Sequence, residues 1–292
     1  MRTRKFLKNL GNEFVYGGHL LSLSLLGIVV ASAIILKINF TLDSLIIVYL
    51  VVQVIYSYNR YKEIEQDIIT NPERSEYLKK QKNFFPFLIS FYILLLGLLL
   101  ISYSGAGAAY LVLVMVFLGV SYTMIFKRFT YKFLGFKNIF VAFTSSLLAP
   151  YLAFYYSNSL GWSVLLLSIF IFLKTFINTS FSDVKDIGAD KKEGLKTLAI
   201  YLGEKRLLIF LKILSISSII PLLIGVYIDE LPYYSLFLFL TVFYNFYCFK
   251  EFEKRKKKQE KIFSILVDAE FYLWPVTVFV GKIIFNIGQE LL

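Results

Sequence analysis

The stretch GWSVLLLSIFIFLKTFI, residues 161–177, is followed after four further residues by SDVKDIGADKKEGLKTLAIYLG, residues 182–203. The first stretch is almost wholly apolar, and about 20 such residues in a helix cross the roughly 30 Å hydrocarbon core of a bilayer. The second stretch begins with three aspartates spaced three and four residues apart. Together they predict a membrane helix that ends in a cluster of carboxylates.

The whole chain has the composition of a membrane protein. Of its 292 residues, 58% are hydrophobic and 18% aromatic, which is more apolar surface than a soluble domain of this size can cover. We expect one all-α domain over residues 1–292 with nine transmembrane helices. The expected spans are residues 14–36, 42–58, 84–102, 106–126, 138–157, 160–182, 206–228, 231–248 and 263–287. The single cysteine, Cys248, excludes an intramolecular disulfide and a cysteine-based metal cluster.

The basic residues predict the orientation in the membrane. Of the 31 lysines and arginines, 27 lie in the N-terminal segment and in residues 59–83, 127–137, 183–206 and 249–262. With nine spans these segments share one side, and the positive-inside rule places them, with the N-terminus, in the cytoplasm. The net charge of +11 follows from this topology and from anionic lipids, so we expect no nucleic-acid partner. The Ile-, Lys-, Phe- and Tyr-rich composition indicates a prokaryotic plasma membrane.

Asp183, Asp186 and Asp190 share one helix face if the sixth span continues past Ser182, because each residue turns a helix by about 100°. Three carboxylates on one stripe repel each other unless they are protonated, solvated or bridged by a cation. Oxygen-only ligands suit Mg²⁺, which usually bridges one or two carboxylates to phosphate oxygens. Gly194 then fits a helix C-cap. The alternative is a solvated helix end whose aspartates balance the lysines around them.

A second oxygen-rich stripe follows the second span. Asn59, Glu63 and Asp67 are spaced four residues apart and share a face, whereas Glu65 points roughly the other way. Both stripes lie on the predicted cytoplasmic side. They therefore predict a site that holds Mg²⁺ between them and binds one diphosphate, with Asn59 as a neutral ligand or hydrogen-bond donor. Either stripe alone is equally consistent with a solvated helix face.

Basic side chains near the same surface are candidates for contact with phosphate oxygens. Lys127 and Arg128 end the segment YTMIFKR, which begins with Tyr122, and these three are the first candidates for substrate binding. Arg74 and Lys196 are further candidates with less support. The alternative for the basic groups is ordinary anchoring at the cytoplasmic surface.

Several polar groups lie inside predicted spans, where charge is costly. Lys174 and Asn178 share a face of the sixth span and either line the substrate cavity or, for Lys174, pair with a neighbour. Asp268 and Glu270 begin the ninth span and either orient an acceptor and assist proton removal or pair with Lys212 or Lys250. His19, the only histidine, fits a helix–helix contact better than a role in acceptor binding.

The pattern D-xx-D-xxx-D-xxx-G-xx-T from Asp183 to Thr197, followed by Gly203, resembles the second aspartate-rich motif of the UbiA-type intramembrane prenyltransferase superfamily. The segment YTMIFKRFTYKFLGFKN, residues 122–138, is similar to another stretch typical of that family. The resemblance in topology covers the whole chain, whereas the specific motifs cover about forty residues.

The first motif of that family usually reads NDxxDxxxD. In this chain Arg60 follows Asn59 where an aspartate is common, Glu63 stands at the second aspartate and Asp67 at the last. The Arg60 departure removes one carboxylate, which implies a weaker or differently built first metal site.

The resemblance implies nine transmembrane helices bundled around a central cavity. Members of the family bind an isoprenyl diphosphate through Mg²⁺, and the metal and basic residues stabilise charge on the leaving pyrophosphate. The resulting carbocation alkylates a hydrophobic acceptor, while an apolar cavity keeps water away. We therefore expect an integral-membrane prenyltransferase that acts on an isoprenyl diphosphate and a hydrophobic, aromatic or lipid acceptor. Neither the acceptor nor the prenyl chain length follows from the sequence.

Two other functions remain open at this point. A membrane terpene cyclase of the same superfamily would quench the cation internally, without an acceptor. A transporter is less favoured, because most acidic groups lie at the predicted cytoplasmic face, whereas transporters place ionisable residues near the midplane.

Overall fold

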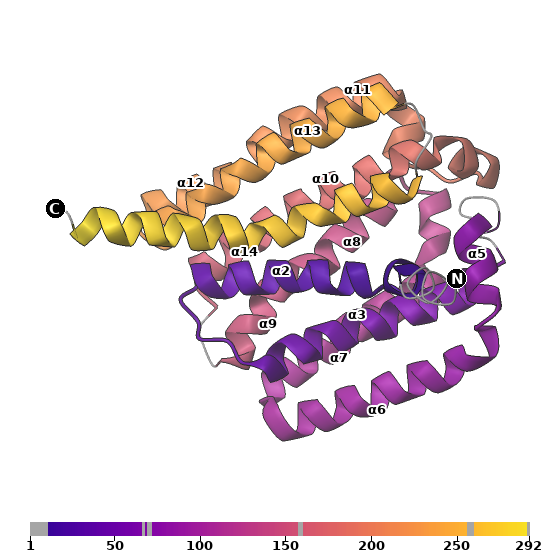
Figure 1. The fold of residues 1–292 in the computed structure, drawn as a ribbon, viewed down its shortest axis with the longest axis horizontal. Coiled ribbons are helices and arrows are strands. Elements are labelled where there is room, and N and C mark those ends of the chain that lie inside the picture. The colour runs from indigo at the N-terminus through magenta and orange to yellow at the C-terminus, as the bar shows by residue number, and fades with distance from the viewer. Residues whose placement is uncertain (1–10, 66–67, 69–71, 157–159, 256–259, 291–292) are drawn as a thin grey trace, which may run out of the picture. The chain divides into compact units, whose positions relative to one another are not determined.

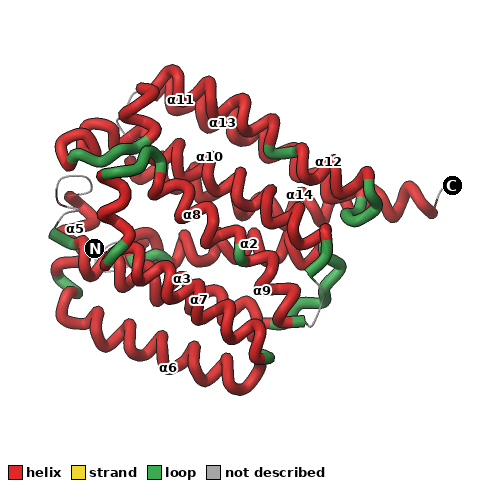
Figure 2. The backbone as a smooth tube through the Cα atoms, turned by 180° about the vertical axis from the view of Figure 1, so that it is seen from behind, coloured by secondary structure: helices red, strands yellow, loops and turns green. Residues whose placement is uncertain are grey.

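The described residues of the computed structural model, 11–65, 68, 72–156, 160–255 and 260–290, form helices joined by loops, with no strand among them (Figures 1 and 2). Long apolar segments fold as helices because a helix satisfies its own backbone hydrogen bonds in hydrocarbon. The chain divides into two compact units, which are described separately. The first comprises Met1–Leu26 and Thr41–Phe126, and the second Gly27–Phe40 and Lys127–Leu292. Helix α2 (His19–Ile35) contributes to both units.

The first unit is built around the long helix α3. Its elements are α3 (Leu42–Glu63), α5 (Pro72–Lys79), the 3₁₀-helix η1 (Lys82–Phe84), α6 (Phe85–Tyr103) and α7 (Ala106–Met124). Helix α3 packs against both α6 and α7, and it lies beside α7 in Figure 1. Gly119 permits the close approach of α7, because a Cβ atom there would lie 2.5 Å from Ile55 Cδ1 on α3.

The second unit surrounds helix α10. Its elements after the 3₁₀-helix η2 (Phe126–Tyr131) are α8 (Phe136–Ser146), α9 (Leu148–Tyr155), α10 (Trp162–Glu193), α11 (Leu198–Ser217), α12 (Ile220–Tyr227), the 3₁₀-helix η3 (Tyr233–Phe239), α13 (Leu240–Arg255) and α14 (Glu260–Glu290). Helix α10 packs against α8, α9, α11, α12 and α14, so it is the central element of this unit.

Seven helices of the described chain are long and apolar enough to cross a membrane. They are Leu42–Glu63, Lys82–Tyr103, Ala106–Met124, Phe136–Tyr155, Trp162–Glu193, Leu198–Tyr227 and Ile265–Glu290. The other two expected spans, 14–36 and 231–248, correspond to the shorter helices α2, with 17 residues, and α13, with 16. Helix α13 starts late because the residues after Pro232 form η3. The all-α membrane fold is therefore confirmed, while the count of nine crossings stays a prediction.

The predicted continuation of the sixth span past Ser182 is confirmed. Helix α10 has 32 residues, about 48 Å at 1.5 Å per residue, so it is longer than a bilayer core is thick. It ends where predicted, at Gly194, whose φ of 76° is the left-handed conformation that glycine adopts readily. The amide of Leu195 donates to the Asp190 carbonyl at 3.0 Å and closes the last turn.

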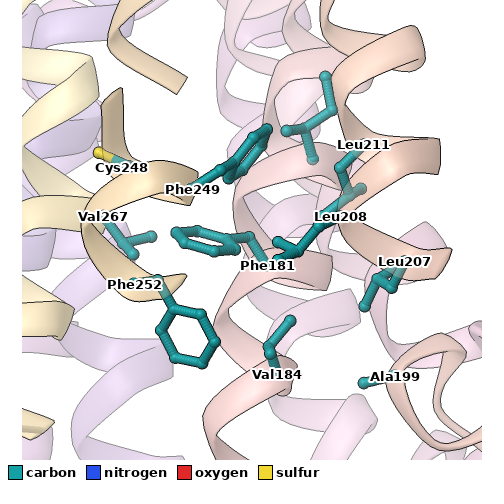
Figure 3. Close-up of a cluster of buried hydrophobic side chains, with 11 residues drawn as sticks. Phe181, Val184, Ala199, Leu207, Leu208, Leu211, Cys248, Phe249, Phe252 and Val267 are labelled. Carbon is teal, nitrogen blue, oxygen red and sulfur yellow. The ribbon is translucent and has the colours of Figure 1, made fainter. Parts of the chain in front are cut away.

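An apolar cluster fixes the aspartate-bearing end of α10 (Figure 3). It joins α10 to α11, α13 and α14 through buried residues that include Phe181, Val184, Leu207, Leu208, Leu211, Phe249, Phe252 and Val267. The ring of Phe181 packs edge-on against Phe249 and Phe252, with centroid distances of 4.7 and 5.7 Å. The carboxylates that follow Phe181 thus project from a helix end that three neighbouring helices hold in place.

Candidate active site

The three aspartates of α10 lie on one side of the helix, within an arc of about 60°. Asp183 and Asp190 are buried, with 2% and 6% of their surface exposed, and Asp186 between them is partly exposed. Carboxylates are rarely buried to this degree unless they are paired or bind a ligand. The stripe is therefore not the fully solvated helix end that its lysine-rich flank allows.

Asp183 is held by two side chains from the start of α8. Lys137 Nζ donates to its Oδ1 at 2.8 Å, and Asn138 Nδ2 donates to its Oδ2 at 2.9 Å. The carboxylate thus accepts a charge-assisted bond on one oxygen and an amide bond on the other. Asp183 consequently ties α10 to α8 and has a fixed orientation.

Asp190 has an oxygen without a partner. Its Oδ2 is fully buried and accepts no hydrogen bond from any residue that the structure describes. Leaving a buried acceptor unpaired costs about 1–3 kcal/mol, so such atoms often mark a position where a ligand or ion binds. The residues present fit Mg²⁺, because the stripe offers only oxygen atoms and one of them is unused.

A closed metal cage is absent from the described residues, since no three His, Cys, Asp or Glu side chains converge there. Mg²⁺ rarely uses such cages in proteins. It keeps several waters and takes one or two carboxylates together with substrate phosphates. An open stripe such as Asp186 and Asp190 is therefore compatible with Mg²⁺ brought by a diphosphate.

The first stripe lies at the end of α3, in the first unit. Asn59 and Glu63 are one turn apart and partly exposed. Asn59 Oδ1 accepts a hydrogen bond of 2.5 Å from Thr123 Oγ1 on α7. Asp67, the third predicted member, lies outside the described residues. The structure thus brings two of the three residues to one helix end.

Two charged residues beside this stripe, Glu65 and Arg60, make contacts of their own. Glu65, expected on the opposite side, is exposed and pairs with Lys79 at 3.3 Å and Lys82 at 3.5 Å. Arg60 stacks its guanidinium on the ring of Tyr56, 4.7 Å from the centroid. Arg60 therefore has an aromatic contact on its own helix, where the related motif has a carboxylate.

The basic candidates occupy helix ends and loops. Tyr122 lies in the last turn of α7 in the first unit, partly exposed. Lys127 and Arg128 lie in η2 in the second unit, partly exposed and exposed respectively, with Arg128 5.6 Å from the ring centroid of Phe129. Arg74 is partly exposed on α5 in the first unit. Tyr122 and Arg74 thus belong to the first unit, and Lys127 and Arg128 to the second.

Lys196 makes two backbone hydrogen bonds in the second unit. Its amide donates to the Thr130 carbonyl at 2.9 Å, and its carbonyl accepts from the Gly135 amide at 3.0 Å. Its exposed Nζ lies 3.3 Å from the Lys132 carbonyl. The loop that follows the aspartate helix is thereby joined to the loop that precedes α8 and Lys137.

Lys174 and Asn178 lie deeper along α10 and are bonded to neighbouring helices. Lys174 is fully buried, and its Nζ is 2.6 Å from Glu270 Oε1 on α14. It also donates to Asn245 on α13, whose Nδ2 donates to Glu270 Oε2 at 2.6 Å. Asn178 donates to the Val267 carbonyl at 2.8 Å. Of the two alternatives for Lys174, the pairing with a neighbour is the one found. The predicted pairing of Glu270 with Lys212 or Lys250 is wrong, because its ion-pair partner is Lys174.

A groove of about 690 Å³ lies between α8, α9 and α10. Its lining is almost wholly apolar and includes Phe143, Leu147, Trp162, Leu165, Ile169 and Phe172. The six lining residues from α10 include Leu165, Ser168, Ile169 and Phe172, which lie on the same side of that helix as the aspartates. Phe172 is about 16 Å along the helix from Asp183, and it stacks with Phe176 one turn nearer, at a centroid distance of 6.3 Å.

Comparison with known families places the chain among proteins with this arrangement. The model of the UbiA prenyltransferase family matches residues 20–274, most of the chain. The chain belongs to this family. The predicted membership of the UbiA-type prenyltransferases is therefore confirmed, while the roles of the two aspartate-rich stripes stay predictions.

Individual proteins similar to this UbiA-family chain are prenyl-lipid synthases or UbiA homologs by name. A digeranylgeranylglyceryl phosphate synthase from Sulfolobus acidocaldarius is 33% identical over 103 residues, which span 35% of each chain. A UbiA homolog from Aeropyrum pernix has the same fold, with a TM-score of 0.65 at 16% identity over 91% of this chain and 97% of that one. A UbiA homolog from Archaeoglobus fulgidus bound to DMAPP and Mg²⁺ has a TM-score of 0.61 at 15% identity over 91% and 98%.

Sequence reasoning about this UbiA-family chain missed Lys137 and Asn138. Both end the segment YTMIFKRFTYKFLGFKN, residues 122–138, which resembles a stretch of the family, but the resemblance implies no role for these two residues. The signal that was available is a lysine and an asparagine at the start of an apolar helix, on the predicted side of the aspartates. Which carboxylate they would contact depends on the packing of α8 against α10, which no spacing within either segment reveals.

Proposed function

We propose that this chain is an integral-membrane prenyltransferase that transfers an isoprenyl group from its diphosphate to the hydroxyl of a glyceryl phosphate lipid. The proposal includes nine crossings around a central cavity, a cytoplasmic N-terminus, and an active site at the cytoplasmic face. The membrane of a prokaryotic cell is the proposed location. The name of the Sulfolobus acidocaldarius relative supports the acceptor class, and the family supports the prenyl transfer.

The observation that carries the proposal is the buried, unpaired Oδ2 of Asp190 on a stripe with Asp186 and Asp183. Asp186 and Asp190, with Glu63 and Asp67 of the first stripe, would hold Mg²⁺. When bound, the ion neutralises the diphosphate and lowers the cost of charge on the departing pyrophosphate. Asn59 and Asp183 complete the stripes, and Lys137 and Asn138 keep Asp183 in position.

Basic residues take the role of binding the diphosphate itself. Lys127, Arg128, Arg74 and Lys196 are the proposed contacts to phosphate oxygens, and Tyr122 is proposed as a hydrogen-bonding neighbour. Arginine suits this role because its planar guanidinium binds two phosphate oxygens at once. Lys174 is left out, because its ammonium is fully buried against Glu270 and cannot reach a ligand without breaking that pair.

The apolar side of α10 receives the prenyl group. The groove between α8, α9 and α10 offers a water-poor surface for the prenyl tail, about 16 Å or more from the aspartates. Phe172 lines the end of the groove nearest Asp183, and Phe176 lies one turn closer to Asp183 on the same side of the helix. Their ring faces attract positive charge, so they favour an allylic cation formed beside them.

The proposed reaction breaks the allylic C–O bond, and the electron pair leaves with pyrophosphate. The acceptor oxygen then forms a new C–O bond to the allylic carbon and gives up its proton, so the product is an ether. The basic residues and the carboxylate stripes orient the diphosphate, while the apolar groove excludes water that would otherwise capture the cation.

The direct test supplies purified protein with labelled geranylgeranyl diphosphate, Mg²⁺ and a glyceryl phosphate that carries one geranylgeranyl ether. We expect pyrophosphate and digeranylgeranylglyceryl phosphate in equal amounts, and neither in EDTA. Hydrocarbon products formed equally well without the acceptor would contradict the transfer and favour a cyclase. Undiminished turnover in EDTA would contradict the role of Mg²⁺.

A further inference from the structure

A chain of polar side chains crosses the first unit between the start of α2 and the middle of α3. His19 Nδ1 lies 2.5 Å from Tyr49 Oη and 3.1 Å from Gln53 Nε2. On the other side of the ring, His19 Nε2 lies 3.7 Å from Glu13 Oε1. Gln53 is fully buried, and 23% of the His19 side chain is exposed, so the chain of contacts is reached from one side.

The hydrogen-bond partners fix which atom carries each hydrogen. Ser22 Oγ donates its hydrogen to the Gly18 carbonyl at 3.0 Å, so it can only accept from Gln53 Nε2, at 3.0 Å. The Gln53 amide group therefore also donates to His19 Nδ1. A hydrogen on that nitrogen would face the Gln53 amide hydrogens, so Nδ1 carries none. Its single lone pair is shared by the Gln53 amide and the Tyr49 hydroxyl, and the ring proton sits on Nε2, facing Glu13.

Two acceptor atoms are left over by this arrangement. Tyr49 must donate to His19 Nδ1, which leaves the lone pairs of its oxygen available. Gln53 Oε1 is buried and accepts no hydrogen bond from any described residue. Tyr49 Oη and Gln53 Nε2 contact the same ring nitrogen, so the two side chains that carry these acceptors are neighbours. A ligand that satisfies them must bring a hydrogen-bond donor such as a hydroxyl, which a phosphate or carboxylate anion lacks.

We propose that Tyr49 and Gln53 bind the acceptor hydroxyl and that Tyr49, His19 and Glu13 carry its proton away. The proposal rests on the proposed prenyl transfer. As the acceptor oxygen bonds to the allylic carbon, its hydrogen passes to Tyr49 Oη, and the Tyr49 hydrogen passes to His19 Nδ1. The imidazolium formed faces the Glu13 carboxylate and then returns one proton to water at its exposed edge. Tyr49 is thus the catalytic residue, and His19 and Glu13 act through it.

Two further observations agree with this assignment. Gln53 precedes Asn59 on α3 by six residues, about 9 Å, so the hydroxyl site lies just below the first stripe on its own helix. The His19 ring beside Glu13, together with hydrogen bonds from Tyr77 and Gln81, lowers the pKa of Glu13 to about 2. Glu13 therefore stays ionised at neutral pH and can stabilise a positive ring beside it.

The test compares an alcohol acceptor with its thiol analogue. Glyceryl phosphate with one geranylgeranyl ether serves as the alcohol, and the same lipid with a thiol in place of the hydroxyl as the second probe. A thiol has a pKa near 8.5 and gives up its proton without a base of this kind. In Tyr49→Phe we expect alkylation of the alcohol to fall by about 100-fold, as for loss of a general base. Alkylation of the thiol, with the Mg²⁺-dependent pyrophosphate release that accompanies it, should stay near wild type.

Tyr16→Phe is the matched control, because Tyr16 donates to Glu73 at 3.1 Å in the same unit and lies outside the chain of contacts. It should leave both rates unchanged. Glu13→Gln tests the proton path at its other end, which is partly exposed. It keeps the proposal testable if Tyr49→Phe fails to fold. We expect it to slow the alcohol reaction by roughly tenfold and spare the thiol.

Alcohol alkylation within about threefold of wild type in Tyr49→Phe would overturn the assignment. So would an equal loss with alcohol and thiol, since that pattern indicates a merely structural role. Wild-type protein that releases no pyrophosphate from the prenyl diphosphate would overturn the proposed function, and the proton path would fall with it. The two failures are distinguishable because only the second appears in the unmutated chain.

Discussion

The two carboxylate stripes end helices of similar character, yet their surroundings differ. On α10, Asp183 is buried and bonded to Lys137 and Asn138, and the helix end is clamped by an apolar cluster. On α3, Asn59 and Glu63 are partly exposed, and Glu65 lies among solvent-exposed lysines. The α10 stripe is thus held in one geometry before any ligand binds. The α3 stripe has more freedom to adjust.

This difference suggests a division of labour between the stripes. A buried, fully bonded carboxylate keeps its position to within a fraction of an ångström, which positioning of a reacting diphosphate requires. A partly exposed stripe tolerates changes of ligand type, and α3 carries such changes in Glu63 and Arg60. We therefore expect substitutions on α10 and its supports to have larger effects than substitutions on α3.

The largest effect should follow from Asp190→Ala. Its unpaired buried oxygen is the proposed attachment point for Mg²⁺ with diphosphate, and no described side chain can replace it. We expect turnover to fall by about 1,000-fold or more, measured as pyrophosphate release at saturating Mg²⁺. Lys191→Ala, an exposed neighbour one residue later, is the control and should retain activity. Full activity in Asp190→Ala would remove the main support for the site.

The next largest effect should be on stability, in Lys174→Met. The substitution leaves Glu270 as an uncompensated charge among α10, α13 and α14, which typically costs about 3–5 kcal/mol. Denaturant unfolding in detergent micelles, followed by near-UV circular dichroism, measures the change. The double variant Lys174→Met/Glu270→Gln removes both charges and should recover most of the loss. A single variant as stable as wild type would mean that the buried pair does not hold α10.

A smaller effect is expected for Lys137→Met. Asp183 then keeps its bond from Asn138 but loses the charged donor at 2.8 Å, a loss of about 1.5–3 kcal/mol for a partly buried charged bond. If the stripe must be preorganised, that change should lower kcat/KM for the prenyl diphosphate by roughly 10- to 100-fold, at 1.4 kcal/mol per tenfold. Steady-state kinetics of pyrophosphate release provide the measurement.

Lys132→Met, at an exposed lysine in the turn that precedes α8, is the matched control for Lys137→Met. It should change kcat/KM very little, because a solvated lysine contributes little to binding or stability. Equal effects in the two variants would show that the loop supplies general positive charge and not a specific partner for Asp183.

The sequence was most informative where a pattern is local. The continuation of α10 past Ser182 and its end at Gly194 both follow from helix periodicity and glycine conformation. Eight of the nine expected spans have a helix over most of their length, while the one at 231–248 is replaced for its first part by η3.

Contacts between segments far apart in the sequence could not be predicted from helix periodicity. Lys174 lies 96 residues before Glu270, and Lys137 lies 46 residues before Asp183. Spacing within a helix tells which residues share a side, and it says nothing about which other helix packs there. His19 shows the same limit, since its bonds to Tyr49 and Gln53 depend on the packing of α2 against α3.

The smallest effect is expected for Arg60→Asp, which restores the carboxylate that the related motif usually has. The arginine that is lost stacks on Tyr56, and a partly exposed contact of this kind contributes only about 0.5–1 kcal/mol. The new carboxylate adds an oxygen ligand on the cytoplasmic end of α3. We expect activity within about threefold of wild type, since the lost contact is worth less than tenfold. The Mg²⁺ concentration for half-maximal activity should be equal or lower, measured by metal titration with Arg60→Gln as the neutral control. A collapse of activity in both variants would show that Arg60 binds a phosphate. Substitutions on the α3 stripe would then reduce activity as strongly as those on the α10 stripe.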